Sequence, residues 1–335
     1  RRAEERGGER MALCGAPSFA PALRRAGFNV VSVANNHALE HGPDVFRETV
    51  GYLKDAGIAV CGLRSKDPGY HSEPVILNVR GRTVGLLAYN WVATDLFPGA
   101  DDLIAQSRDS LVNYTWHRSA SSGWPKVHNE RVVGDLERLR REVDTAVLLP
   151  HWGYEFVHLP PYGVTLEARA FIDAGADLIL GSHPHVLQGV ERYRGRTIVY
   201  SLGNFVFEAR RRPNRETAIA DVVLEREGAA ITFEPYVINH GFQPEPASAH
   251  RRKHILQLIQ ESTDRLSDPD RASPASDDAL YRLYEEQYGR YKRLGIADQL
   301  KAVLRKPGLA VALAGKAAHA GRLLVRRLSG ERVRW

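Results

Sequence analysis

The stretch ADLILGSHPHV, residues 176–186, decides the fold. Its short aliphatic run is typical of a buried strand and stops at a Gly-Ser pair. The two histidines that follow, His183 and His185, are separated only by Pro184, which restricts the backbone between them. A strand that ends in this way presents two imidazole rings near one point.

Two other apolar runs also lead into a histidine. VVSVANNH ends at His37, and AVLLPHWG contains His151. In α/β sheets, ligands bind in the crevice beyond the carboxyl ends of the strands. Four imidazoles reaching that crevice from three strands predict a metal site, because neutral imidazole is a common ligand of zinc, manganese and iron. For His151 taken alone, an ordinary core or surface histidine is the alternative.

Apolar runs alternate with helical patterns along most of the chain. The patterns predict helices at 17–26, 43–56, 133–141 and 165–173, and hairpins at 73–90, 186–207 and 218–239. Helices that flank buried strands, with hairpins added, are typical of a layered α/β fold, here an α+β sandwich.

The composition changes near residue 240. Residues 1–240 carry the strands and the motifs, and residues 241–335 carry helical patterns interrupted by Pro, Ala and Ser. We therefore expect one layered domain over 1–240 and a helical, basic extension over 241–335. Residues 91–130 are irregular, and a loop of this length in a compact domain is usually functional or disordered.

Charge is distributed unevenly over the 335 residues. The net charge is +6, but residues 301–335 hold nine Lys and Arg against one Glu, which is +8 and leaves −2 for the rest. A basic tail favours contact with an anionic polymer or a membrane surface over a nucleic-acid-binding fold, so no nucleic-acid partner is expected. A solvated amphipathic helix is the alternative for this tail. The two cysteines give neither a disulfide framework nor a CxxC metal pair.

Three separated motifs resemble one known family. VVSVANNHALEHG, LLPHWGYEF and GADLILGSHPHVLQGVERYRGRTIVYSLGNFVF follow the order of the CapA family (PGA_cap), the bacterial capsule and poly-γ-glutamate synthesis proteins, over roughly residues 16–240. The resemblance implies a fold similar to that of calcineurin-like metallophosphoesterases. It also implies a cell-envelope or membrane-associated setting.

The first motif, ANNHALEHG, resembles the Asn-His motif of that family. The resemblance implies Asn36 as a metal ligand, with Asn35 as an accessory residue. It implies His37 as the catalytic acid that protonates a leaving group. Glu40 is the second predicted catalytic residue; it stands where the family usually has Asp, and it keeps the charge on a longer side chain.

The other two motifs imply further ligands. HWGYEF supplies His151 as a metal ligand with Glu155 nearby as an accessory residue, and GSHPHV supplies His183 and His185 as metal ligands. Two more signature positions are accessory residues without an assigned role: Glu191 and Asn204. For Asn204, a simple turn residue is the alternative.

The resemblance implies two divalent ions, Mn, Fe or Zn, in the complete protein. Two such ions about 4 Å apart bind a phosphoryl oxygen and lower the pKa of a bound water. The predicted function is therefore metal-dependent hydrolysis of a phosphoester-type bond in capsule or poly-γ-glutamate synthesis. The alternative is a non-catalytic protein on the same fold that binds or assembles an anionic envelope polymer.

Two motifs of the family are not found upstream of Asn35. Family members begin with a strand that ends in Gly-Asp, followed by Asn-Leu-Glu, whereas this chain begins RRAEERGGERMALCG. We therefore expect a domain truncated at its N-terminus, with one metal site lacking a carboxylate. Whether such a chain is active stays open at this point.

Overall fold

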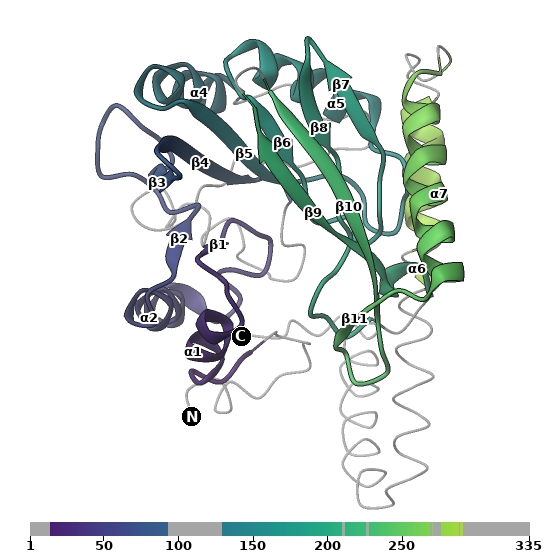
Figure 1. Cartoon of the computed structure of the whole chain (residues 1–335), viewed down its shortest axis with the longest axis horizontal. Coiled ribbons are helices and arrows are strands. Elements are labelled where there is room, and N and C mark those ends of the chain that lie inside the picture. Colours follow the sequence, from purple (N-terminus) through teal and green to yellow (C-terminus); the bar gives the residue numbers. More distant parts are fainter. Residues whose placement is uncertain are drawn as a thin grey trace, which may run out of the picture. The chain divides into compact units, whose positions relative to one another are not determined.

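Figure 1 shows the computed structural model of the chain, which describes residues 14–92, 129–209, 212–225, 228–268, 270, 276–287 and 289–290. The chain divides into two compact units between Tyr284 and Glu285. All the elements named below belong to the first unit. In the second unit, the described residues 285–287 and 289–290 are helical.

The helices and strands of the first unit alternate along the chain as the sequence predicts. In chain order they are α1 (Phe19–Arg25), β1 (Val30–Ser32), α2 (Gly42–Asp55), β2 (Ala59–Cys61), β3 (Val75–Val79), β4 (Arg82–Asn90), α4 (Asn129–Glu142), β5 (Thr145–His151), α5 (Tyr162–Asp173), β6 (Leu178–Leu180), β7 (Val190–Tyr193), β8 (Arg196–Val199), α6 (Arg212–Arg215), β9 (Glu216–Leu224), β10 (Ala229–Ile238), β11 (Pro244–Pro246) and α7 (Ala249–Leu266). The predicted mixed α/β fold class is confirmed.

The strands form three sheets. The largest has the order β3-β4-β5-β6-β8-β7, with parallel neighbours in its centre and an antiparallel hairpin at each edge. A second, antiparallel sheet has the order β11-β10-β9, and β1 pairs with β2 in parallel. The central parallel strands all end at the same edge of the large sheet, which is where the predicted ligands lie.

Helices cover one face of the large sheet. Side chains alternate between the two faces of a strand, and Leu148 and Ile179 point to the face that carries α4 and α5. There they pack with Leu136 of α4 and Phe171 of α5, all four fully buried. This layer holds the central strands, and so their carboxyl ends, in fixed positions.

The second sheet covers the opposite face (Figure 1). Val147 of β5 and Leu178 of β6 directly precede Leu148 and Ile179 in the sequence, so their side chains point to the other face. They pack against Val222 of β9 and Ile231 of β10. Two sheets packed face to face, with helices outside one of them, are the α+β sandwich that the sequence predicts.

A smaller layer brings the first motif to the sheet. Helices α1 and α2 and strands β1 and β2 bury Phe46, Ile58 and Val60 in one cluster with Ala88 of β4. Leu149 of β5 packs against the same cluster. The loop after β1, which carries the ANNH motif, is thereby held beside the ends of β4 and β5.

Two elements beyond residue 240 also belong to the first unit. β11 pairs with β10, and α7 buries Ile255 and Ile259 against Leu187 and Ala218. The domain division at residue 240 stays a prediction. Residues 93–128 of the irregular loop and the basic tail, 301–335, lie outside the described residues. Among the described helices, none has the length and hydropathy that a membrane span requires.

Candidate metal centre

The segment after β6 is fixed to the end of β5. The Ser182 amide donates a hydrogen bond to the carbonyl of Pro150 (2.9 Å), and the Trp152 amide donates to the carbonyl of Ser182 (3.0 Å). Ser182 and His151 thus pair as a bridge that extends the parallel ladder by one step. The histidines that follow therefore leave the sheet edge in a defined direction.

His183 and His185 both have a left-handed backbone conformation, with φ of +99° and +59°. Residues other than glycine rarely adopt it, and each instance costs on the order of 1–3 kcal/mol. The amide of Phe156 donates to the carbonyl of Pro184 (2.7 Å) and secures the turn between them. The two rings lie with centroids 5.8 Å apart. Strain of this kind is concentrated at functional sites.

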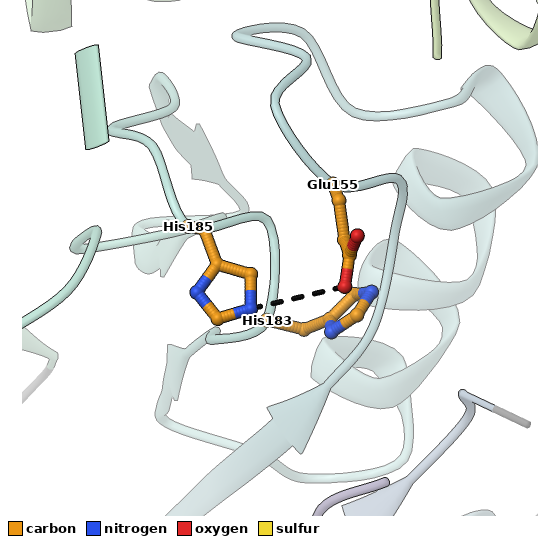
Figure 2. A group of neighbouring side chains, drawn as sticks. All are labelled: Glu155, His183 and His185. Carbon is orange, nitrogen blue, oxygen red and sulfur yellow. Dashed lines mark ion pairs between the residues drawn. The ribbon is translucent and has the colours of Figure 1, made fainter. Parts of the chain in front are cut away.

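Glu155, His183 and His185 converge on one point (Figure 2). One ligand atom from each residue lies within 4.8 Å of the others. Oε1 of Glu155 is 3.9 Å from Nε2 of His185. A carboxylate and two imidazoles are an ordinary ligand set for zinc, and imidazole also suits iron.

The chemistry of these side chains fits a divalent cation. The Nδ1 atom of His183 is buried and has no hydrogen-bond partner among the described residues. Such an atom costs about 1–3 kcal/mol, and a bound cation would give its lone pair a partner. Burial, helped by neighbouring imidazoles, lowers the pKa of His183 well below its usual value. Metal ligands must be neutral imidazoles, so the environment favours the state that binds.

His151 lies beside His183, with ring centroids 4.8 Å apart. Its Nε2 is 3.0 Å from Oδ1 of Asn36, and its Nδ1 is 3.1 Å from Oγ of Ser182. Burial, with smaller contributions from His185 and His37, lowers the pKa of His151 as well. The four residues predicted as metal ligands from the sequence, which include Asn36 and His151, are therefore brought together.

His37 and Glu40 form a pair at the same crevice. Nδ1 of His37 contacts Oε1 of Glu40, whose side chain is only 1% exposed, whereas that of His37 is 27% exposed. The charge of His37 contributes to the lowered pKa of His151, His183 and His185, after their burial. His37 thus lies close enough to the other histidines to affect their pKa, and the buried Glu40 carboxylate holds its Nδ1.

The predicted accessory residues differ in position. Asn35 accepts a hydrogen bond from the His37 amide (2.9 Å) and so shapes the loop. Asn204 contacts His185, with Oδ1 2.7 Å from Nδ1. Glu191 is engaged elsewhere: Oε1 pairs with Arg169 (2.7 Å), and the other oxygen accepts from the hydroxyl of Tyr200.

Two aromatic residues at the site were not predicted. The ring of Phe207 lies 4.8 Å from that of His185, and the ring of Phe156 stacks on it at 6.0 Å. Each stands within a motif already singled out, GNFVF and HWGYEF. Their place within those motifs is the one signal in the sequence that could have indicated a role at the site.

Comparison with known families decides the relationship. The chain matches the family model described as "Bacterial capsule synthesis protein PGA_cap" over residues 2–209. The chain belongs to this family. The resemblance inferred from the three sequence motifs is therefore confirmed.

Curated relatives match over most of the chain. The capsule biosynthesis protein CapA of Bacillus anthracis is 29% identical over 245 residues, 73% of this chain and 56% of that protein. The PGA biosynthesis protein CapA of Bacillus subtilis strain 168 is 28% identical over 244 residues, 72% of this chain and 59% of that protein. The chain thus spans little more than half the length of either relative.

Among solved structures, a putative 5'-nucleotidase from Staphylococcus aureus, in complex with alpha-ketoglutarate, is similar at a TM-score of 0.43 and 15% identity. The alignment covers 73% of this chain and 44% of that one.

Proposed function

We propose that this protein acts in capsule or poly-γ-glutamate synthesis as a divalent-metal-dependent hydrolase of a phosphoester-type bond. The observation that carries the proposal is the group formed by Glu155, His183 and His185, with the buried Nδ1 of His183, which has no hydrogen-bond partner in the part of the chain that the structure describes. Membership in the capsule synthesis family and the names of the two CapA relatives support the biological setting.

In this proposal, Glu155, His183 and His185 hold one divalent ion, which is Mn, Fe or Zn. Asn36 and His151, whose Oδ1 and Nε2 atoms are 3.0 Å apart, contribute ligands to a second ion. A bound divalent ion supplies Lewis-acid polarisation of a phosphoryl oxygen and a lowered pKa for a water.

The His37–Glu40 pair is the proposed general acid, which donates a proton to the leaving group. The buried carboxylate of Glu40 accepts the Nδ1 proton of His37, so the other ring nitrogen is the one that holds or releases a proton. A positioned general acid of this kind contributes typically about 10²–10⁴-fold to a rate. His37→Gln is therefore expected to keep the metal and to slow hydrolysis.

The first test is the metal content of the purified chain, measured by elemental mass spectrometry after loading with Mn, Fe or Zn. We expect near-stoichiometric metal that is lost in a His183→Ala, His185→Ala double variant. His250→Ala, on the exposed surface of α7, is the matched control and should keep the metal. Absence of metal from the loaded wild-type chain would overturn the proposal.

Activity is tested on the metal-loaded chain with a phosphodiester and a phosphomonoester of p-nitrophenol. Hydrolysis that depends on added metal, and that falls in His37→Gln without loss of metal, supports the proposed reaction. A chain that holds metal and cleaves neither ester argues for the second candidate function.

The second candidate is a non-catalytic protein that binds an anionic envelope polymer. The net charge of +8 on residues 301–335 and the relatives' names, which refer to synthesis, favour it. It predicts salt-sensitive binding of poly-γ-glutamate without turnover, because exposed charges are screened by salt. Replacing Arg322, Arg326 and Arg327 by Gln should weaken that binding. The same variant also tests whether the basic tail binds anionic lipid vesicles.

A further inference from the structure

Asn204 lies after β8 in the SLGNF segment and is buried beside His185. Its side chain makes three contacts with polar atoms. Oδ1 is 2.7 Å from Nδ1 of His185, and Nδ2 lies 3.0 Å from the carbonyl of Asn214 and 3.4 Å from the carbonyl of His185. Neither the metal ligands nor the proton-transfer pair of the proposed function includes this residue.

The two carbonyl oxygens fix the orientation of the Asn204 amide. A carbonyl can only accept a hydrogen bond, so the amide nitrogen must face the carbonyls of Asn214 and His185. The amide oxygen must then face the ring of His185. Aspartate could not replace Asn204 in full, because a carboxylate has no proton to donate to two carbonyls.

The orientation of Asn204 in turn fixes the proton on His185. Nδ1 faces an oxygen that only accepts, so Nδ1 carries the proton in the neutral ring. The lone pair is then on Nε2, which lies 3.9 Å from Oε1 of Glu155. A lone pair and a carboxylate oxygen that face each other at this separation are stabilised by a cation between them.

The surroundings hold the ring in this orientation. Phe207 and Phe156 lie against His185, with centroids at 4.8 Å and 6.0 Å. The turn before Asn204 requires glycine at position 203. Gly203 has φ of +74°, and the Cβ of any other residue there would lie 3.0 Å from the carbonyl oxygen of Glu216. Ring and amide are therefore both constrained before any ligand binds.

We propose that Asn204 is a positioning residue that selects the Nδ1–H tautomer of His185 and so presents Nε2 to the metal centre. The inference rests on the proposed metal site, although the tautomer itself is a property of the metal-free chain. Hydrogen-bonding partners of ligating histidines fix their tautomer and raise ligand basicity, and their loss typically costs about 10–100-fold in metal affinity.

The test uses the full-length chain labelled with ¹⁵N-histidine, in which two-bond nitrogen–proton correlations report the tautomer of each ring. In the metal-free wild type we expect His185 with its proton on Nδ1. In Asn204→Leu, which removes the acceptor, we expect the Nε2–H tautomer and a zinc affinity about 10–100-fold weaker. Zinc is the probe, and its binding is measured separately by titration with a competing chelator.

Two variants separate positioning from general damage. Asn204→Asp keeps an acceptor for Nδ1 and is expected to keep the Nδ1–H tautomer, even where its lost donors lower stability. Asn239→Leu is the matched control: Asn239 closes the turn between β10 and β11 by accepting from the amides of Gly241 and Gln243. It should change neither the tautomer nor the zinc affinity.

The outcomes decide the positioning role independently of the metal. An Nδ1–H tautomer that persists in Asn204→Leu, or a wild-type ring protonated on both nitrogens, overturns the inference. If the tautomer depends on Asn204 as expected but the wild-type chain binds none of zinc, manganese and iron, the positioning role is supported and only the proposed function is overturned. If Asn204→Leu does not fold, Asn204→Ser, whose hydroxyl is too short to reach Nδ1, takes its place.

Discussion

Asp135 of α4 and His183 after β6 are both buried polar side chains of the first unit, but only one of them has its hydrogen bonds satisfied. The Asp135 carboxylate, 1% exposed, accepts from the backbone amides of His71 and Ser72 and from the hydroxyl of Tyr89. His183, 7% exposed, has an Nδ1 atom without a partner among the described residues.

The difference separates a structural group from a proposed binding group. Asp135 ties α4 to the segment before β3 and to β4, and three donors offset its desolvation. The unpaired atom of His183 lies in a strained turn beside Glu155, where an added ligand would improve the local interactions. Removal of Asp135 should therefore damage stability, and removal of His183 should damage binding.

The largest effect is expected for Asp135→Ala. The variant removes the acceptor of the buried Ser72 amide and of the buried Tyr89 hydroxyl, each at a cost of about 1–3 kcal/mol, and also that of the part-buried His71 amide. We expect a loss of about 3 kcal/mol or more in the free energy of unfolding, measured with urea, and unchanged metal content in the folded fraction. Asp44→Ala, whose exposed ion pair with Arg47 is on α2, should change stability by less than about 1 kcal/mol. If Asp135→Ala lowers the free energy of unfolding by less than about 1 kcal/mol, Asp135 is not the structural group that this comparison with His183 requires.

The opposite behaviour is expected for His183→Leu. An apolar side chain of similar size removes the unsatisfied nitrogen, so the metal-free variant should be as stable as the wild type or more stable by about 1–3 kcal/mol. Zinc at 100 times its Kd should stabilise the wild type by about 2.7 kcal/mol and the variant not at all. Thermal unfolding with and without zinc measures both. A variant that still gains stability from zinc would show that His183 is not a ligand.

Acid should destabilise the metal-free chain through the buried histidines His183 and His151. Burial lowers the pKa of His183 and His151 in the folded state, so they stay neutral while unfolded histidines, with a usual pKa of 6.5, take up protons. The stabilising contribution is complete above pH 6.5 and is lost as the pH falls below it, by up to about 1.4 kcal/mol per pH unit for each histidine. His183→Leu should show a shallower slope between pH 6.5 and 5. Equal slopes would mean that other groups cause the acid sensitivity.

The sequence predicted that His151 and His183 would lie close together, because local pattern determines their positions. An aliphatic run followed by SHPH can end only at the edge of the sheet, and the parallel order of β5 and β6 places His151 beside His183. Asp135 could not be recognised in the same way, because its partner Ser72 is 63 residues away in the sequence. The roles of Glu155 and Asn204 also depend on loops that bring distant segments together, which periodicity does not reveal.

The smallest effect is expected for Ser182→Ala, and it tests whether His151 resembles Asp135 or His183. Oγ of Ser182 lies 3.1 Å from Nδ1 of His151 and 3.3 Å from the carbonyl of Pro150, and one hydroxyl proton can serve only one of them. Loss of one such hydrogen bond costs about 0.5–1.5 kcal/mol, which corresponds to roughly tenfold or less in zinc affinity. If His151 is held mainly by Asn36, stability and zinc affinity both change within these limits. A loss of zinc binding as complete as in His183→Leu would instead show that the orientation of His151 is as important to the site as His183 itself.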